Sequence, residues 1–243
     1  MILELDCGNS AIKWRLMDGA GLVVHRGRAD DLESLIAQIV DLTEAVSRCR
    51  LVSVRGLEQT KSIVDGIRAL GVRPEVVTPS AALRGVVNGY DDYSRLGLDR
   101  WLALVAAFNR CRAACLVIDI GTAVTVDYVD TSGRHLGGYI APGLPMLRRL
   151  IVKHAASVSL PDLEREALQS NLAPARSTSP AVESGCYLML RAFLNERLSQ
   201  ADSELGSSYR VFVTGGDAVI MNAHPKVIIA EDLVLDGLAL ALP

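Results

Sequence analysis

An acidic residue and a glycine-led turn stand near the start of the chain, in the motif Asp6-x-Gly8-Asn9-Ser10-x-x-Lys13. An apolar strand that ends in a carboxylate and turns on a glycine brings the carboxylate and backbone N–H groups to one point, and glycine lets a phosphate approach the main chain. The amide, hydroxyl and ammonium groups that follow add hydrogen-bond donors and positive charge. The carboxylate could hold a hydrated Mg²⁺, because Mg²⁺ keeps most of its waters. The motif predicts a phosphate-binding turn, and the plainer alternative is an ordinary hairpin.

The same pattern returns in the second half of the chain as Asp119-x-Gly121-Thr122. Each copy consists of an apolar strand, the acidic turn, a second strand, a further turn and a third strand. The offset between Asp6 and Asp119 is nearly half of the 243 residues, which indicates duplication of one α/β unit. Two acidic turns that face each other can bracket the phosphates of one nucleotide.

A third motif, Gly97-x-Asp99-Arg100, places an acidic and a basic residue side by side at the start of a helical pattern near the middle of the chain. Asp99 could act as a base toward a substrate hydroxyl, and Arg100 could pair with an anionic group of the substrate. The plainer alternatives are that Asp99 caps the helix and that Arg100 is a surface charge. Tyr90 lies just upstream on a loop-like stretch, where it either walls a pocket or anchors the loop. A further turn, Thr214-Gly215-Gly216-Asp217, could let a ring or ribose lie on its backbone, or could simply join a strand to a helix.

Alternating strands and helices must position these residues. Hydrophobic periodicity predicts helices at Leu32–Val40, Lys61–Leu70, Trp101–Phe108, Met146–His154, Pro161–Gln169 and Ala181–Arg197. Beyond the strands that flank the two acidic turns, it predicts strands at Leu22–Arg26, Arg50–Val54, Glu75–Thr78, His135–Ile140 and Arg210–Thr214. We expect the boundary near Arg110–Ala114, with an N-terminal lobe of residues 1–112 and a C-terminal lobe of residues 113–243.

Composition excludes several classes of protein. Hydrophobic residues make up 50% of the chain and charged residues 22%, which is typical of a globular protein and not of a disordered one. The net charge of −3 lacks the basic footprint of nucleic-acid binding, and no apolar run is long enough to span a membrane. Five scattered cysteines fit a reducing cytoplasm and show no zinc-site spacing. The Walker A and Gly-x-Gly-x-x-Gly motifs are both missing, so any nucleotide must be held by another kind of fold.

Taken in order, these motifs, together with Gly137-Gly138-x-x-x-Pro142-Gly143, resemble those of type III pantothenate kinases. One departure is Ser10, where many members carry threonine; the hydroxyl is retained. The resemblance implies two duplicated ribonuclease-H-like lobes of the acetate and sugar kinase/Hsp70/actin fold, with the active site in the cleft between them. It also implies transfer of the ATP γ-phosphoryl group to pantothenate, the first step of coenzyme A biosynthesis, in a cytoplasmic homodimer.

The resemblance further implies roles for individual residues. Asp99 matches the catalytic proton acceptor, and Asp119 matches the ligand of a monovalent cation, K⁺ or NH₄⁺. Asp6 is the expected contact of the Mg²⁺ that accompanies ATP. The positions that match pantothenate contacts are Tyr90, Gly97, Leu98, Asp99, Arg100 and Thr178. The positions that match ATP contacts are Asp6, Cys7, Gly8, Asn9, Ser10, Ala11, Ile12, Lys13 and Thr122.

Two rival functions remain open from the sequence. One is a kinase of the same fold that acts on another small molecule, such as a sugar or a carboxylic acid. The other is a nucleotide-binding accessory regulator that does not turn over its nucleotide. The pairing of Asp99 with Arg100 argues against a pure nucleotide binder, which needs no base beside a substrate-binding cation.

Overall fold

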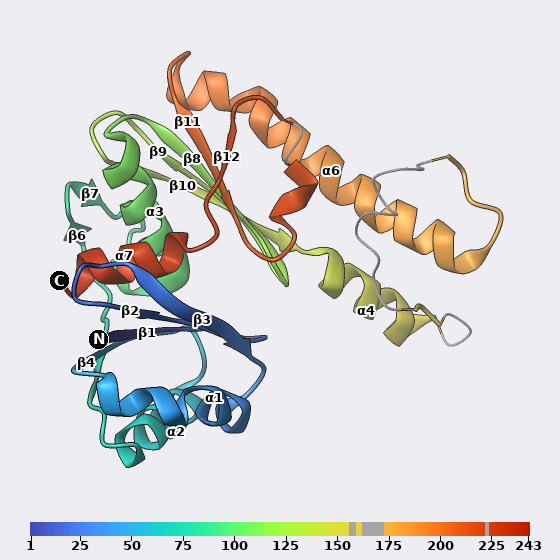
Figure 1. The fold of residues 1–243 in the computed structure, drawn as a ribbon. Coiled ribbons are helices and arrows are strands. Elements are labelled where there is room, and N and C mark those ends of the chain that lie inside the picture. Colours follow the sequence, from blue (N-terminus) through green and yellow to red (C-terminus); the bar gives the residue numbers. More distant parts are fainter. Residues whose placement is uncertain (156–158, 162–172, 222–223) are drawn as a thin grey trace. The chain divides into compact units, whose positions relative to one another are not determined.

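The structure is a computed structural model that describes residues 1–155, 159–161, 173–221 and 224–243 (Figure 1). The chain forms two compact units, Met1–Arg110 with Asp232–Pro243, and Cys111–Glu231. The predicted lobes, 1–112 and 113–243, are contiguous in sequence, whereas the first compact unit also takes up the last residues of the chain. These residues include α7 (Leu233–Ala241), which packs against β1 (Ile2–Cys7) and β4 (Arg48–Ser53).

The first unit is built on a five-stranded mixed sheet of order β3-β2-β1-β4-β5. β1 pairs antiparallel with β2 and parallel with β4. The remaining strands of this sheet are β2 (Ile12–Met17), β3 (Val23–Ala29) and β5 (Pro74–Val76). The other helices of this unit are α1 (Leu32–Ile39), η1 (Val40–Ala45), α2 (Leu57–Ala69), η2 (Tyr93–Arg95) and α3 (Leu98–Cys111). A small hairpin of β6 (Ala82–Leu83) and β7 (Val86–Val87) precedes η2.

The second unit repeats that topology with the order β10-β9-β8-β11-β12. Its strands are β8 (Cys115–Ile120), β9 (Ala123–Val129), β10 (His135–Pro142), β11 (Arg210–Thr214) and β12 (Val227–Ile229). Its helices in the described part are α4 (Leu144–His154), α6 (Thr178–Leu205) and the short η3 (Ala218–Met221). In each sheet the first strand pairs antiparallel with the second and parallel with the fourth. The duplication predicted from the two acidic motifs is therefore confirmed.

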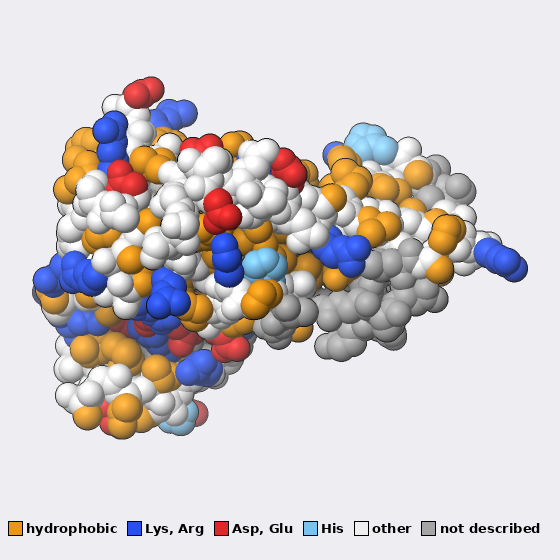
Figure 2. All heavy atoms as spheres, turned by 90° about the horizontal axis from the view of Figure 1, so that it is seen from above, with side chains coloured by type: hydrophobic (Ala, Val, Ile, Leu, Met, Phe, Trp, Pro, Cys, Tyr) orange, Lys and Arg blue, Asp and Glu red, His pale blue; other side chains and the backbone are white. Residues whose placement is uncertain are grey.

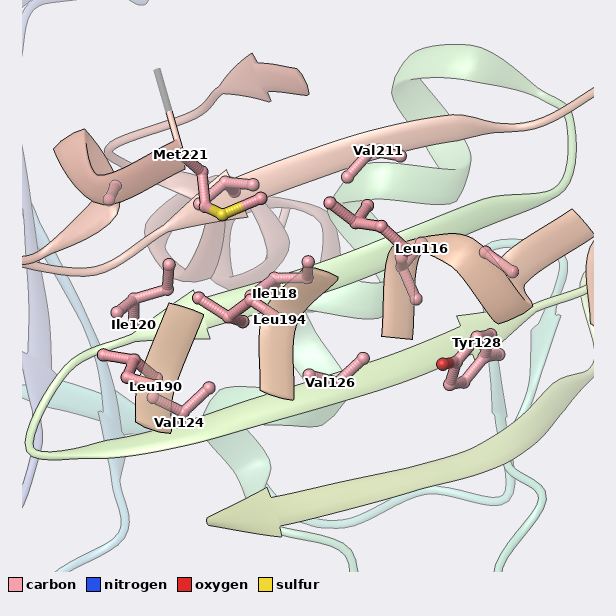
Figure 3. Close-up of a cluster of buried hydrophobic side chains, with 14 of the residues drawn as sticks. Leu116, Ile118, Ile120, Val124, Val126, Tyr128, Leu190, Leu194, Val211 and Met221 are labelled. Atoms are coloured by element: carbon pink, nitrogen blue, oxygen red, sulfur yellow. The ribbon is translucent and has the colours of Figure 1, made fainter. Parts of the chain in front are cut away.

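Strand alternation decides which face of each sheet forms a core. In β1, Leu3, Leu5 and Cys7 pack with Leu35 of α1 and Ile67 of α2 in the core of the first unit. In the second unit, side chains from β8 and β9 point toward α6 and η3 and form the cluster in Figure 3. The apolar face of each sheet thus fixes the strand register, and with it the side of the sheet on which the motif aspartates lie.

Most predicted elements are present with shifted ends. The strand predicted at Arg210–Thr214 is β11, while the helix predicted at Ala181–Arg197 is part of the longer α6. The helix predicted at Pro161–Gln169 lies outside the described residues from its second position onward. Helix α7 was not predicted, because apart from Asp236 and Gly237 its residues are all apolar and show no amphipathic stripe. Within the described residues, no helix combines the length and apolar character that a membrane crossing requires.

Candidate functional site

The first acidic motif forms the hairpin turn between β1 and β2. Asp6 and Lys13 are direct cross-strand partners, so their side chains leave the same face of the sheet close together. Gly8 begins the turn, and a Cβ at this position would lie 3.3 Å from the carbonyl oxygen of Ala11. The turn therefore presents a carboxylate, an ammonium group and backbone N–H groups within a few residues, as the sequence predicted.

Not every residue of that motif can offer its side chain to a ligand. Cys7 and Ile12 are 0% exposed, and both side chains belong to the core of the first unit. Burial, with a smaller contribution from the charge of Asp6, raises the pKa of the Cys7 thiol to about 12, so this thiol stays protonated and unreactive. These two positions can contribute only backbone groups, whereas Asn9 and Ser10 are exposed at the tip of the turn.

The sequence analysis did not single out Arg55, which contacts the same turn. Arg55 follows β4, and its Nε donates a hydrogen bond to the carbonyl oxygen of Gly8 at 2.7 Å. The neighbouring Val54 donates its backbone N–H to the carbonyl oxygen of Cys7 at 3.2 Å. The loop after β4 thus holds the acidic turn in place from the adjacent parallel strand. The available signal was positional, because the duplicated unit carries its glycine-rich turn after the equivalent strand.

The second acidic motif lies in the turn between β8 and β9. Asp119 is paired across the sheet with Thr125 of β9 and lies beside Thr214 of β11. Gly215 follows with a φ of +97°, and a Cβ there would lie 2.4 Å from Asp119 Oδ1 and 2.4 Å from the carbonyl oxygen of Ile120. Only glycine can adopt this conformation with so little space. The Gly-Gly turn, which the sequence analysis considered as a surface for a ring or ribose, therefore packs closely against the Asp119 carboxylate.

The loops beside the two acidic turns differ in charge. Arg55 lies three residues after Val52, which pairs with the first motif aspartate; Asp217 lies three residues after Thr214, which pairs with the second. Asp217 is 1% exposed, and its backbone N–H donates to the carbonyl oxygen of Ile120 at 2.9 Å. The loop after the fourth strand thus carries an arginine in the first unit and a buried aspartate in the second.

The third group of predicted residues surrounds the start of α3. Gly97 leaves room for Asp99, because a Cβ at position 97 would lie 2.7 Å from Asp99 Oδ1. The same carboxylate oxygen accepts a hydrogen bond from the Arg100 backbone N–H at 2.8 Å. Arg100 is 7% exposed, donates from Nη1 to the hydroxyl of Tyr90 at 2.8 Å and lies over the Tyr90 ring, 5.6 Å from its centroid. The alternative that Arg100 is a surface charge is wrong.

Thr178, the remaining predicted pantothenate contact, lies in the second unit. It is the first residue of α6, follows the N-cap residue Ser177 and is exposed. Leu98 is the first residue of α3 and is half-buried. Thr122 is half-buried in the turn after β8, where its carbonyl oxygen accepts from the Gly143 backbone N–H at 3.0 Å.

The two acidic turns offer oxygen donors for cations. In the described part of the chain, no three His, Cys, Asp or Glu side chains come together as a metal-ligand cluster. A Mg²⁺ ion that is bound to a triphosphate needs only one or two protein carboxylates, and the first turn carries the carboxylate of Asp6. In the second unit, Asp119 Oδ1 and the Ile120 carbonyl oxygen converge on Gly215. Carboxylate and carbonyl oxygens of this kind also suit a monovalent cation.

Comparisons with known proteins agree with these features. A family model described as type III pantothenate kinase matches residues 2–200. A type III pantothenate kinase of Pseudomonas putida (strain W619) is 45% identical over 247 residues, covering 100% of this chain and 99% of the relative.

Two solved structures bear on the fold alone. One is described as a Baf family transcriptional activator from Campylobacter jejuni (TM-score 0.61, 18% identity, 98% of this chain and 95% of that one). The other is the activator of the 2-hydroxyisocaproyl-CoA dehydratase from Clostridium difficile with bound ADPNP (TM-score 0.52, 13% identity, 99% and 92%). Together with the repeated sheet order, such neighbours confirm the predicted fold class.

Proposed function

Because the chain belongs to the type III pantothenate kinase family, we propose that its acidic turns and the start of α3 carry the reaction of that family. The protein phosphorylates pantothenate with ATP and a divalent metal ion, the first step of coenzyme A biosynthesis. Phosphoryl transfer has a loose transition state, so most of the rate comes from positioning and charge neutralisation. We therefore assign each side chain to the substrate group or ion that it would hold in position.

The arrangement around Asp99 is the observation that carries the assignment. Its carboxylate is fixed by the Arg100 backbone N–H, so it can align the substrate hydroxyl and accept its proton late in the transfer. The Arg100 guanidinium is buried against Tyr90 and suits the carboxylate of pantothenate. Gly97 supports this function because a side chain there would displace the Asp99 carboxylate. Leu98 and Thr178 complete the proposed pantothenate contacts.

ATP is assigned to the turn from Asp6 to Lys13 together with Thr122. Backbone N–H groups of the turn and the Lys13 ammonium would offset phosphate charge, while Asp6 would hold the Mg²⁺ through its water shell. Magnesium would supply electrostatic stabilisation of the charge that develops on the transferred phosphoryl group. The cross-strand pairing of Asp6 with Lys13 supports this assignment, since it places both charges on one face.

A monovalent cation, K⁺ or NH₄⁺, is assigned to Asp119. The support is the convergence of a carboxylate and a carbonyl oxygen on Gly215, together with the buried Asp217 in the adjoining loop. We expect activity in K⁺ buffer to exceed activity in Na⁺ buffer, and Asp119→Asn to abolish most of that difference. Asp130→Asn, in the exposed turn after β9, is the matched control. Equal rates in the two buffers would remove the cation from the mechanism.

The protein is proposed to act as a homodimer in the cytoplasm. Elements β10, α4 and α6 of the second unit pack together and carry eight exposed hydrophobic side chains: Leu136, Tyr139, Ile140, Met146, Leu150, Val152, Leu188 and Met189. Figure 2 shows exposed hydrophobic side chains over α4 and α6, at the right of the view. Such a surface is typical of an oligomer interface. Each of the five cysteines lies outside any disulfide, which fits a reducing compartment.

Light scattering tests the dimer. The wild type should have twice the mass of one chain at micromolar concentration, and Leu150→Glu should shift it toward a monomer. A monomeric wild type would reject this part of the proposal.

The catalytic assignment is tested with Asp99→Asn in a coupled assay for ADP release with pantothenate and ATP. A general base contributes about 10²–10⁴-fold, so kcat should fall by that factor while the affinity for ATP is unchanged. Asp92→Asn, at an exposed carboxylate just before η2, should keep wild-type kcat. An unchanged kcat in Asp99→Asn would remove Asp99 from this function.

A further inference from the structure

Arg55 is held in a fixed orientation by its own loop. Its backbone N–H donates to Ser53 Oγ at 3.2 Å, and its backbone carbonyl oxygen accepts from Thr60 Oγ1 at 3.3 Å. The two hydroxyl oxygens lie 2.7 Å apart. If Ser53 donates to Thr60, every proton in this ring has an acceptor. A closed ring of three hydrogen bonds thus ties β4 to the start of α2 and fixes the backbone of Arg55.

The charge of Arg55 is left available to a ligand. Among the described residues, no carboxylate forms an ion pair with Arg55, and the side chain is half-buried. Its Nε is committed to the carbonyl oxygen of Gly8, so the guanidinium plane lies against the turn and the two Nη groups remain. A half-buried guanidinium next to a phosphate-binding turn attracts anions, because it is screened less than an exposed charge.

The duplicated unit shows that the fold does not require a cation in this loop. In the second unit the residue three positions after the strand partner of the motif aspartate is Asp217, so the loop after the equivalent strand carries a negative charge beside the acidic turn. The arginine is therefore a property of the first turn and not of the scaffold.

From these contacts we propose that Arg55 is a positioning residue for the ATP phosphates. It fixes the Gly8 end of the turn through its Nε and adds positive charge to the turn, a function outside the Asp6–Lys13 motif. This inference rests on the proposal that the turn binds ATP.

The test compares Arg55→Ala, Arg55→Lys and Thr60→Val with Arg68→Ala, an exposed arginine on α2. A hydrogen bond from a charged donor is worth about 10- to 100-fold in binding. Arg55→Ala should therefore raise both the KM for ATP and the calorimetric Kd for ADP by that factor, with the KM for pantothenate unchanged. Arg55→Lys keeps the charge and should recover part of the loss. Thr60→Val breaks the ring with the charge retained, and should raise the ATP KM by about 2- to 10-fold.

The outcomes separate this inference from the proposed function. A wild type that releases no ADP with pantothenate refutes the function, whatever the variants do. A wild type that is active, with Arg55→Ala leaving the ATP KM and ADP Kd within twofold of Arg68→Ala, overturns the assignment of Arg55. Equal losses for ATP and pantothenate would also overturn it, because they indicate a general structural effect. If Arg55→Ala does not fold, Arg55→Lys and Thr60→Val take its place: an ATP KM and ADP Kd within twofold of those of Arg68→Ala in both variants would overturn the assignment of Arg55.

Discussion

Replacing one buried carboxylate, Glu4, is expected to destabilise the first unit severely. Glu4 is 0% exposed and lies in register between Arg15 of β2 and Arg50 of β4. Its Oε2 accepts from Arg15 Nε at 2.6 Å, and its Oε1 accepts from Arg50 Nη1 at 2.7 Å. Arg15 also donates to Asp236 of α7 at 2.7 Å, whereas Arg50 pairs with no other carboxylate of the described residues.

The size of the effect follows from these partners. In Glu4→Gln one amide oxygen must serve two guanidinium groups, so one buried cation loses its partner. Removing one side of a buried ion pair costs about 3–5 kcal/mol, a large part of the roughly 5–15 kcal/mol that stabilises an ordinary domain. Adding Arg50→Met removes the cation with the fewest partners, and roughly half of the lost stability should return.

Tryptophan fluorescence reports directly on this unit, because both tryptophans, Trp14 and Trp101, belong to it. Urea unfolding followed by this signal should show the loss for Glu4→Gln and the partial recovery in the double variant. Glu58→Gln, at an exposed position in the first turn of α2, is the matched control and should stay within about 1 kcal/mol of the wild type. If Glu4→Gln unfolds at the same urea concentration as Glu58→Gln, the argument from buried charge is refuted.

Three further changes test other parts of the molecule. Gly215→Ala should lower kcat by about a hundredfold, because the new Cβ would lie 2.4 Å from the carboxylate of Asp119 in the proposed cation site. Gly216→Ala is the control: its Cβ would have no heavy atom within 4 Å, so its steady-state kinetics should be close to those of the wild type. A hydrogen bond from Cys115 lowers the pKa of the Cys111 thiol to about 6. The rate at which iodoacetamide alkylates Cys111 should therefore increase as the pH rises through 6 and the thiolate forms. Cys115→Ala should shift this increase toward pH 9, and mass spectrometry measures the alkylation of both proteins. Gly237→Ala should destabilise the first unit by at least about 1–3 kcal/mol in thermal melting, since its Cβ would lie 2.1 Å from a backbone carbonyl oxygen of α3.

The duplicated scaffold could be predicted from local pattern. Each copy is recognisable from an apolar strand, an acidic residue and a glycine turn, all of which lie within about a dozen consecutive residues. The strands that follow each motif lie where the alternation placed them, with ends shifted by a few residues. The grouping of Tyr90 with Arg100 was likewise within reach, because both residues flank one loop and one helix start.

What the sequence could not provide depends on distant contacts. Arg15 looks like an exposed strand residue until α7 brings Asp236, 221 positions away, to within 2.7 Å. Arg55 looks like an ordinary loop residue until the parallel pairing of β1 with β4 places it against the turn at Gly8. In both cases the chemistry of the side chain is set by a partner whose position follows from the topology and not from sequence spacing.

The two copies of the hairpin have diverged in charge while keeping their geometry. Asp6 faces Lys13 across its hairpin, and Asp119 faces Thr125 at the equivalent register. With Arg55 beside the first turn and Asp217 beside the second, one turn is rich in cations and the other in carboxylates. A turn with an ammonium and a guanidinium group favours phosphates, whereas a turn with two carboxylates and no cation among these positions favours a bound cation. Duplication followed by opposite charge changes would therefore give one scaffold a turn that suits phosphates in the first unit and a turn that suits a cation in the second.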